Sequence, residues 1–144
     1  MNVETILKTK GAVVVTIAPS ATISEAVALL SRKRIGALVV STDGREPLGI
    51  LSERDIVQGL GQRGASLLDA KVDELMTRSV ITCAPQDRLA DLMALMTERR
   101  IRHLPVLDGG RLAGVVSIGD VVKNRLDEME WESSSLKTYI AGAA

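Results

Sequence analysis

Apolar and polar positions follow one another along this chain in an order that occurs twice. The first occurrence opens with the β-branched run 13–17, which is typical of a buried strand. Residues 22–34 carry apolar side chains at helical spacing, after a Thr-x-x-Glu capping box. Two apolar runs, 37–40 and 48–51, flank a turn and predict a hairpin, and a second helix is expected from Asp55. The unit is strand, helix, strand, strand, helix.

The second occurrence lies sixty-six residues further on. Residues 14–40 align without a gap with residues 80–106, and ten of the twenty-seven aligned positions are identical. Unrelated segments of ordinary composition would match at about two. After a one-residue length change in a turn, residues 49–55 align with 114–120. Duplication on this scale predicts two copies of one unit that share a core.

The repeats predict the domain organisation. The first repeat would occupy residues 1–66 and the second 67–128, with a tail over 129–144. The glycine-rich stretch 59–64 has little periodicity and predicts a linker between the repeats. From residue 120 onward, apolar side chains continue at helical spacing into the tail and predict an amphipathic helix. This helix would either pack on its own domain or seal a dimer.

Composition narrows the class of protein. Eighteen basic and eighteen acidic residues cancel, so no overall field draws the chain to nucleic acid or anionic lipid. There is no Phe, one Trp and one Tyr, which counts against single-stranded nucleic acid, whose bases stack on aromatic rings. No apolar run has membrane-spanning length, and no signal peptide is evident. We expect a cytoplasmic protein that binds neither nucleic acid nor membranes.

Catalytic and metal chemistry lack their usual residues. Cys83 is the sole cysteine, which leaves no disulfide and no Cys-rich zinc site, and its position in a strand predicts a buried, inert thiol. His103 is the sole histidine and has no partner for a metal site or a His-based triad. No Walker-type phosphate loop is present. We therefore expect no enzymatic activity and no structural metal.

One motif closes each repeat and offers a binding site. Gly-h-h-Ser-x-x-Asp, with h apolar, places Ser52 and Asp55 where a strand meets a helix. The second copy does the same with Ser117 and Asp120. Free backbone N–H groups and the positive end of a helix suit phosphate, and a carboxylate can accept from both hydroxyls of a ribose. The same spacing is also an ordinary helix cap, and both interpretations stay open.

Together these features resemble a tandem pair of CBS domains, a Bateman module. The resemblance rests on the order of elements, on the doubled motif, on Arg-Ile-Arg-His-Leu-Pro-Val at 100–106 and on Met-Thr-Arg-Ser-Val-Ile-Thr at 76–82. It covers residues 3–126. It implies an α/β fold of the α+β kind, in which two βαββα repeats pack with pseudo-two-fold symmetry, here followed by a C-terminal amphipathic helix.

The resemblance also implies a function. Members of the family bind AMP, ADP or ATP, and sometimes NAD(H) or S-adenosylmethionine, in two clefts between the repeats. The chain is therefore expected to be an adenine-nucleotide-binding regulatory module that senses energy or redox state and signals through conformational change. Its expected partners are a second copy in a homodimer and an unknown protein effector. The alternative is an interaction or oligomerisation module that needs no ligand.

Carried over by position, the resemblance assigns residues to both clefts. In one cleft Asp120 would hold the ribose, with Ser117 beside it. The rest of that cleft would be Lys10, Gly11, Ala12, Ile35, Gly36 and Val115 along the adenine, and Arg102 and His103 at the phosphates. The mirror cleft would use Asp55 and Ser52, with Ile50, Arg54, Thr77, Arg78, Val80, Ile101 and Arg102 nearby.

The two clefts are not expected to bind phosphate equally. The first repeat has Gly36 and Ala37 where the second has Arg102 and His103, and neither small residue can neutralise a phosphate. Arg54 is the expected compensation in the Asp55 cleft. We therefore expect tighter phosphate binding beside Asp120.

Overall fold

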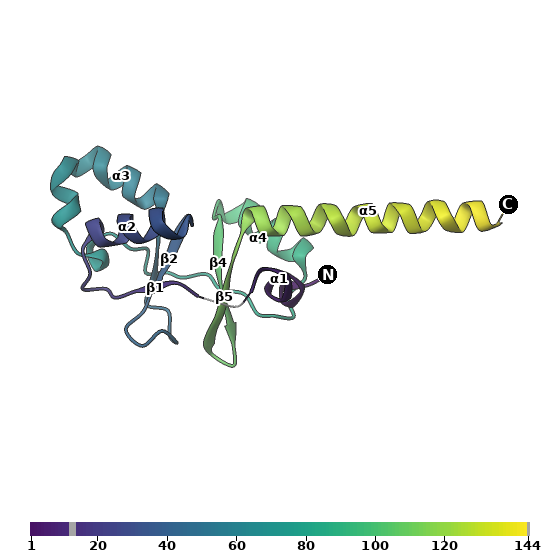
Figure 1. Ribbon diagram of the computed structural model, residues 1–144, viewed down its shortest axis with the longest axis horizontal. Helices are drawn as coiled ribbons and strands as arrows, with labels where there is room; N and C mark the ends of the chain where they lie inside the picture. Colours follow the sequence, from purple (N-terminus) through teal and green to yellow (C-terminus); the bar gives the residue numbers. More distant parts are fainter. Residues whose placement is uncertain (12–13, 144) are drawn as a thin grey trace.

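The structure is a computed structural model that describes residues 1–11 and 14–143 (Figure 1). Ala12, assigned above to the adenine, and Val13, at the start of the first expected strand, lie outside the described residues. The elements are, in order, α1 (Val3–Lys10), β1 (Thr16–Ile17), α2 (Ile23–Lys33), β2 (Ala37–Val40), β3 (Gly49–Ser52), α3 (Glu53–Arg63), the 3-10 helices η1 (Gly64–Asp69) and η2 (Val72–Glu74), α4 (Leu89–Arg99), β4 (His103–Asp108), β5 (Arg111–Ser117) and α5 (Ile118–Ala143).

Each half of the molecule builds a small sheet around its hairpin. β1 runs parallel to β2, and β2 pairs antiparallel with β3, with Ala37 opposite Ser52. In the second half, β4 pairs antiparallel with β5, with His103 opposite Ser117. A parallel bridge from Cys83 to β4 takes the place that β1 holds in the first half. The two expected hairpins and the mixed α/β architecture are confirmed.

Two hydrophobic cores form, and each contains a segment from beyond its own hairpin. Val3 and Ile6 of α1 are buried in the core of the second half. Leu67 and Val72, which lie beyond the first repeat unit, are buried in the core of the first half. The repeat boundaries stay a prediction, but the cores do not follow a division between residues 66 and 67.

The glycine-rich stretch 59–64 is not a linker. α3 continues through it to Arg63 and ends at Gly64, which adopts a positive φ of 66°. A Cβ on Gly59 would lie 2.9 Å from Leu67 Cδ2, so the glycine allows Leu67 to pack closely against the helix. This packing outweighs the low helix propensity of glycine.

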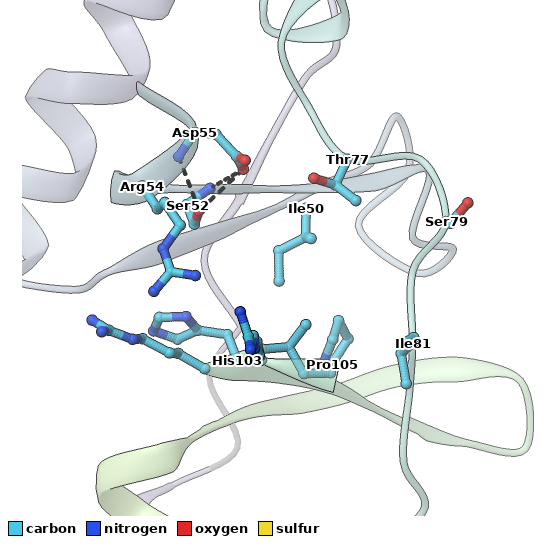
Figure 2. Close-up of a pocket in the computed structure, with 12 residues that line it drawn as sticks. Ile50, Ser52, Arg54, Asp55, Thr77, Ser79, Ile81, His103 and Pro105 are labelled. Atoms are coloured by element: carbon cyan, nitrogen blue, oxygen red, sulfur yellow. Dashed lines mark hydrogen bonds between the residues drawn. The ribbon is translucent and has the colours of Figure 1, made fainter. Parts of the chain in front are cut away.

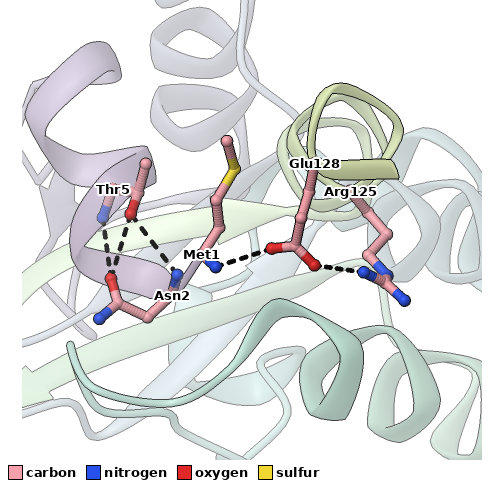
Figure 3. A network of polar contacts seen from close by, with 5 residues as sticks. All are labelled: Met1, Asn2, Thr5, Arg125 and Glu128. Carbon is pink, nitrogen blue, oxygen red and sulfur yellow. Dashed lines mark hydrogen bonds and ion pairs between the residues drawn. The ribbon is translucent and has the colours of Figure 1, made fainter. Parts of the chain in front are cut away.

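The pattern predicts no helix over residues 3–10, because two turns carry too little periodicity to stand out. Asn2 caps α1, accepting a hydrogen bond from the backbone N–H of Thr5 at 3.2 Å. The amino group of Met1 forms an ion pair with Glu128 of α5 at 2.7 Å, and Arg125 contacts the same carboxylate (Figure 3). The Met1 amine and Arg125 hold the pKa of Glu128 below its usual value. These contacts attach α1 to α5.

The expected C-terminal helix is present as α5. Val121, near its start, is fully buried in the second core. Every side chain from residue 129 to residue 142 is exposed, and the helix extends away from the rest of the molecule (Figure 1). Among the described helices, α5 included, none combines the length and apolar character needed to cross a bilayer.

Two glycine substitutions test this packing. A Cβ at Gly49 would lie 2.9 Å from the carbonyl oxygen of Thr77, which accepts a hydrogen bond from Ile50. Gly49→Ala should lower the free energy of unfolding by about 1–3 kcal/mol, because the core must shift. Gly61→Ala meets no atom within 4 Å and should raise it by up to about 1 kcal/mol, because alanine favours the helix. Urea unfolding measures both, and shifts of the same sign would contradict the packing described.

Candidate functional site

Asp55 caps α3 with one of its two carboxylate oxygens. Asp55 Oδ2 accepts hydrogen bonds from the backbone N–H of Ser52 at 2.9 Å and from Ser52 Oγ at 3.1 Å. The Asp55 N–H donates to Ser52 Oγ at 3.2 Å, which closes a capping box. No described residue donates to Asp55 Oδ1. The carboxylate can therefore cap the helix and still present an acceptor to a ligand.

A cavity of about 180 Å³ adjoins this cap and takes its walls from both halves of the molecule. Figure 2 shows Ile50 of β3 and the Asp55 side chain on one wall, with His103 and Pro105 of β4 on the other. The remaining lining residues are Ser52, Arg54, Thr77, Ser79, Ile81, Arg100, Ile101 and Arg102. The cavity combines aliphatic side chains, hydroxyls, one carboxylate and three arginines. These groups suit a base, a sugar and phosphates.

Asp120 forms the matching cap at the start of α5, with one addition. Its Oδ2 accepts from the backbone N–H of Ser117 at 2.9 Å and also from Lys10 Nζ at 2.6 Å. Lys10 donates as well to the Val115 carbonyl oxygen at 3.0 Å. Burial would raise the pKa of Asp120, but the hydrogen bonds from Lys10 and Ser117 and the charge of Lys10 outweigh this and lower it. Asp120 is therefore ionised at neutral pH, and the ammonium group of Lys10 is already bound to its carboxylate.

A larger cavity of about 390 Å³ lies beside Lys10. Its lining residues are Lys10, Val15, Arg34, Ile35, Gly36, Ala37, His103, Val115 and Ser117. Asp120 itself is not among them, but it is bound by Lys10, which is. Sites for small ligands usually measure about 300–1,000 Å³, so this cavity has the volume of such a site, whereas the Asp55 cavity alone is smaller.

A third, open hollow of about 710 Å³, which we call the central hollow, borders both cavities. We call the cavity of about 180 Å³ the Asp55 cavity and the one of about 390 Å³ the Asp120 cavity. The central hollow shares Arg54, Arg102 and His103 with the Asp55 cavity, and Gly36, His103 and Ser117 with the Asp120 cavity. His103 therefore lines all three spaces.

His103 lies against Gly36, the residue that precedes β2. A Cβ on Gly36 would be 3.1 Å from His103 Nε2 and 3.3 Å from Glu53 Oε1, so glycine at this position permits the close approach of the ring. Burial lowers the pKa of His103, and the charges of Lys10 and Arg102 lower it further, while Glu53 and Asp120 act in the opposite direction. The imidazole is therefore neutral at pH 7 and can donate one hydrogen bond and accept another.

Most of the residues assigned from the sequence lie at these cavities, but five do not follow the assignment. Arg78 and Val80 line a separate hollow on the other side of the chain, and Arg78 donates to the Asp73 carbonyl oxygen at 2.9 Å. Gly11 lines none of the described cavities, and neither does Asp120, which reaches its cavity only through Lys10 and Ser117. Arg102 lines the Asp55 cavity and the central hollow, and it is absent from the lining of the Asp120 cavity.

The segment 77–81 alternates between two hollows. Thr77, Ser79 and Ile81 line the Asp55 cavity, whereas Arg78 and Val80 line the separate hollow. The segment bends at Ser79, and the Val80 N–H donates to the Arg78 carbonyl oxygen at 3.0 Å. Its sequence shows no polar–apolar alternation that would have revealed Ser79 and Ile81 as lining residues.

Two further lining residues, Arg34 and Arg100, were also missed. Each is the left-handed C-cap of its helix, with a φ of 54°. Their sequence context indicates a favourable interaction with the helix dipole, but the structure also places Arg34 on the Asp120 cavity and Arg100 on the Asp55 cavity. Their identity at equivalent repeat positions was the available signal.

Cys83 lies outside the cavities and is buried, as expected. Burial raises the pKa of its thiol to about 12, with a smaller contribution from Asp87, so the thiol is neutral and unreactive. Within the described part of the chain, no three His, Cys, Asp or Glu side chains are grouped as a metal site would require.

Comparison with known proteins identifies the family. A family model described as CBS domain matches residues 9–61 and, a second time, residues 72–127. The chain belongs to the CBS domain family. The two matches place one CBS domain around each hairpin, and the cavities described above are lined by residues of both CBS domains.

Three relatives show how far the similarity extends. The CBS-domain protein ATU1752 from Agrobacterium tumefaciens is 44% identical with a TM-score of 0.84, covering 87% of this chain and 99% of that one. The CBS domain pair of protein MJ0100, solved with 5′-methylthioadenosine and S-adenosyl-L-methionine, is 25% identical with a TM-score of 0.78, covering 89% of this chain and 98% of that one. The mitochondrial CBS domain-containing protein CBSX3 of Arabidopsis thaliana is 38% identical over 125 residues. This match spans 84% of the present chain but 61% of CBSX3.

The environment of His103 predicts a pH dependence of stability in this CBS domain pair. Its folded-state pKa lies below the ordinary value, so the unfolded chain binds the proton more readily. Stability should fall as the pH drops below about 6.5, by at most about 1.4 kcal/mol per pH unit from this group. His103→Gln should remove this contribution to the pH dependence of the free energy of unfolding.

Urea unfolding of the wild type and of His103→Gln between pH 7.5 and pH 5.5 measures the difference. The free energy of unfolding of the wild type should decrease relative to that of the variant as the solution is acidified. A difference that stays constant with pH would show that the histidine is not held neutral by its surroundings.

Proposed function

We propose that this CBS domain pair is a regulatory module that binds adenine nucleotides in the cavities between its two domains. The observation that carries the proposal is the doubled cap, in which Asp55 and Asp120 each bind a helix start through Oδ2. No described residue hydrogen-bonds to Oδ1 of either carboxylate. Each Oδ1 is an acceptor for a ribose hydroxyl beside a cavity with aliphatic walls. AMP, ADP and ATP are the first candidates, and NAD(H) is another.

The family supports a ligand that contains adenosine. MJ0100, a similar CBS domain pair, was solved with two such ligands, 5′-methylthioadenosine and S-adenosyl-L-methionine. The present cavities provide no aromatic ring of Phe, Tyr or Trp for stacking, so an adenine would lie between aliphatic side chains. Ile50, Ile81 and Ile101 offer such walls in the Asp55 cavity, and Ile35 and Val115 in the Asp120 cavity.

The charges favour the opposite preference for phosphate from the one expected from the sequence. The Asp55 cavity is lined by Arg54, Arg100 and Arg102. At the Asp120 cavity, Lys10 is already paired with Asp120 and His103 is neutral, which leaves Arg34 as the one arginine in its lining. We therefore propose that the phosphate-rich ligand binds beside Asp55, with its phosphates toward the central hollow. The Asp120 cavity would take a ligand of lower negative charge.

A second function has one observation in its favour. Lys10 Nζ already binds the carboxylate of Asp120, at 2.6 Å from Oδ2, where a ribose would approach. A cleft filled by its own side chain suits an interaction module that needs no ligand. The same ion pair also suits a regulated site, because a ligand that displaces Lys10 would remove a contact between α1 and α5 and change the shape of the module.

The wider biology of the module is proposed on the same basis. The module would act as a homodimer in the cytoplasm, without catalysing a reaction, and would pass its signal to a separate protein effector. Binding would shift the population of module conformations by the difference in affinity between them.

Calorimetry with AMP and ATP tests the nucleotide site. Asp55→Asn and Asp120→Asn each keep an oxygen for the helix cap but lose the charge, so each should weaken binding in its own cavity by about tenfold or more. Asp87→Asn is the matched control, because Asp87 also binds a backbone N–H, that of Ala84 at 2.8 Å, but lies outside the cavities. It should leave the affinity unchanged.

A thermal shift assay separates the two functions. A nucleotide that binds only the folded state raises the melting temperature once its concentration exceeds Kd. If AMP, ATP, NAD and S-adenosylmethionine at millimolar concentration give neither heat nor a shift, the nucleotide proposal fails and the ligand-independent module is favoured. Equal losses in Asp87→Asn and Asp55→Asn would show that the carboxylates act only through folding.

A further inference from the structure

The exposed part of α5 carries a regular apolar stripe. Its apolar members Leu126, Met129, Leu136 and Ile140 are between 51% and 60% exposed. We define the α5 seam as residues Val122, Leu126, Met129, Ser133, Leu136 and Ile140. The spacings between successive members are four, three, four, three and four residues. This is the a/d pattern of a heptad repeat, with Leu126, Ser133 and Ile140 at a.

The seam does not face the body of its own protomer. Val121 is fully buried, and Arg125 and Glu128, one and two turns later, are partly buried beside α1. These residues mark the inward face of the helix. Successive residues of an α-helix are about 100° apart, so the seam, which begins at Val122, is turned about 100° from that face. From Leu126 onward the seam residues are exposed, and this part of α5 projects from the rest of the molecule (Figure 1).

Charges beside the seam select the partner and its direction. In a parallel pair of helices, a g residue faces the e residue of the next heptad on the partner. Glu132 at g would face Lys137 at e of a second copy, and Arg125 at g, which already contacts Glu128 of its own helix, would also face Glu130. Both contacts join opposite charges. In the folded chain, Glu132 and Lys137 form no ion pair with a described residue, so both are free for this contact.

The antiparallel arrangement places like charges together. When two seams overlap fully in opposite directions, g faces g and e faces e. Glu132 would then face Glu132 of the second copy, and Glu130 would face Glu130. Lys123 would face Lys137. Each of these contacts is repulsive, so the same sequence disfavours an antiparallel pair.

We propose that α5 pairs with α5 of a second copy of this chain as a parallel, in-register, two-stranded coiled coil. The pairing spans residues 122–140, roughly 27 Å of helix, and covers the four exposed apolar side chains. Ser133, polar and at the central a position, lowers the stability of the pair. The parallel direction places both CBS domain pairs at the same end of the coiled coil. The proposal does not depend on nucleotide binding.

Disulfide cross-linking of the full chain tests the pairing directly. Ser133→Cys places a thiol at a, where two parallel, in-register helices bring equivalent Cβ atoms together. Ser135→Cys is the matched control, because the same residue type changes two positions away on the outer face of the coil. Under mild oxidation at micromolar protein, the cross-linked fraction of Ser133→Cys should exceed that of Ser135→Cys by at least about fivefold. The unsubstituted chain should give none, since Cys83 is buried.

A charge exchange in the Ser133→Cys background tests the direction. Glu132→Lys should reduce cross-linking, because the introduced ammonium group would then face Lys137 of the second copy. Glu132→Lys combined with Lys137→Glu should restore it. Equal cross-linking at residues 133 and 135, a monomer by light scattering, or no rescue by the double exchange would overturn the proposal.

Discussion

The architecture depends on two segments that complete the hydrophobic cores from outside the hairpins. Val3 and Ile6 of α1 complete the second core, while Leu67 and Val72 complete the first. The chain therefore passes between the halves twice, and neither core is whole without a segment from beyond its own hairpin. Each half loses buried apolar surface if the two separate, and this loss opposes separation. The cavities lie in the space that the two hairpins enclose, so their walls always combine residues of both halves.

The closing motif of each repeat serves two purposes because a carboxylate has two oxygens. Oδ2 of Asp55 and Oδ2 of Asp120 accept from the backbone N–H of Ser52 and Ser117, the residues immediately before their helices. The remaining oxygen can accept from a ligand. The cap and the ligand site are therefore compatible interpretations, and duplication reproduces both together. The copies differ in their cations, since Lys10 is paired with Asp120, whereas arginines from three positions surround the Asp55 cavity.

The direction in which each side chain points limits how reliably site residues can be assigned from a family resemblance. Within the segment 77–82, alternation places Thr77 in the cavity and Arg78 outside it. Arg34 and Arg100 belong to the cavities because their left-handed caps redirect the chain into the hairpin strands. No local periodicity signals the first placement, whereas the repeat alignment, which pairs Arg34 with Arg100, signals the second. The ion pair of Lys10 with Asp120 has no such signal in the sequence, because the two residues are 110 positions apart.

The sequence by itself determined the duplicated unit, the hairpins, the capped helices and the heptad stripe of α5. These features follow from periodicity and capping, which act over a few residues and leave a visible pattern. Only the tertiary structure decided that α1 belongs to the second core, that the stretch 59–64 continues a helix and that Arg102 does not line the Asp120 cavity. Each of these outcomes depends on which distant surfaces pack together. Packing between distant segments is set by their combined shape, and no local pattern in either segment records it.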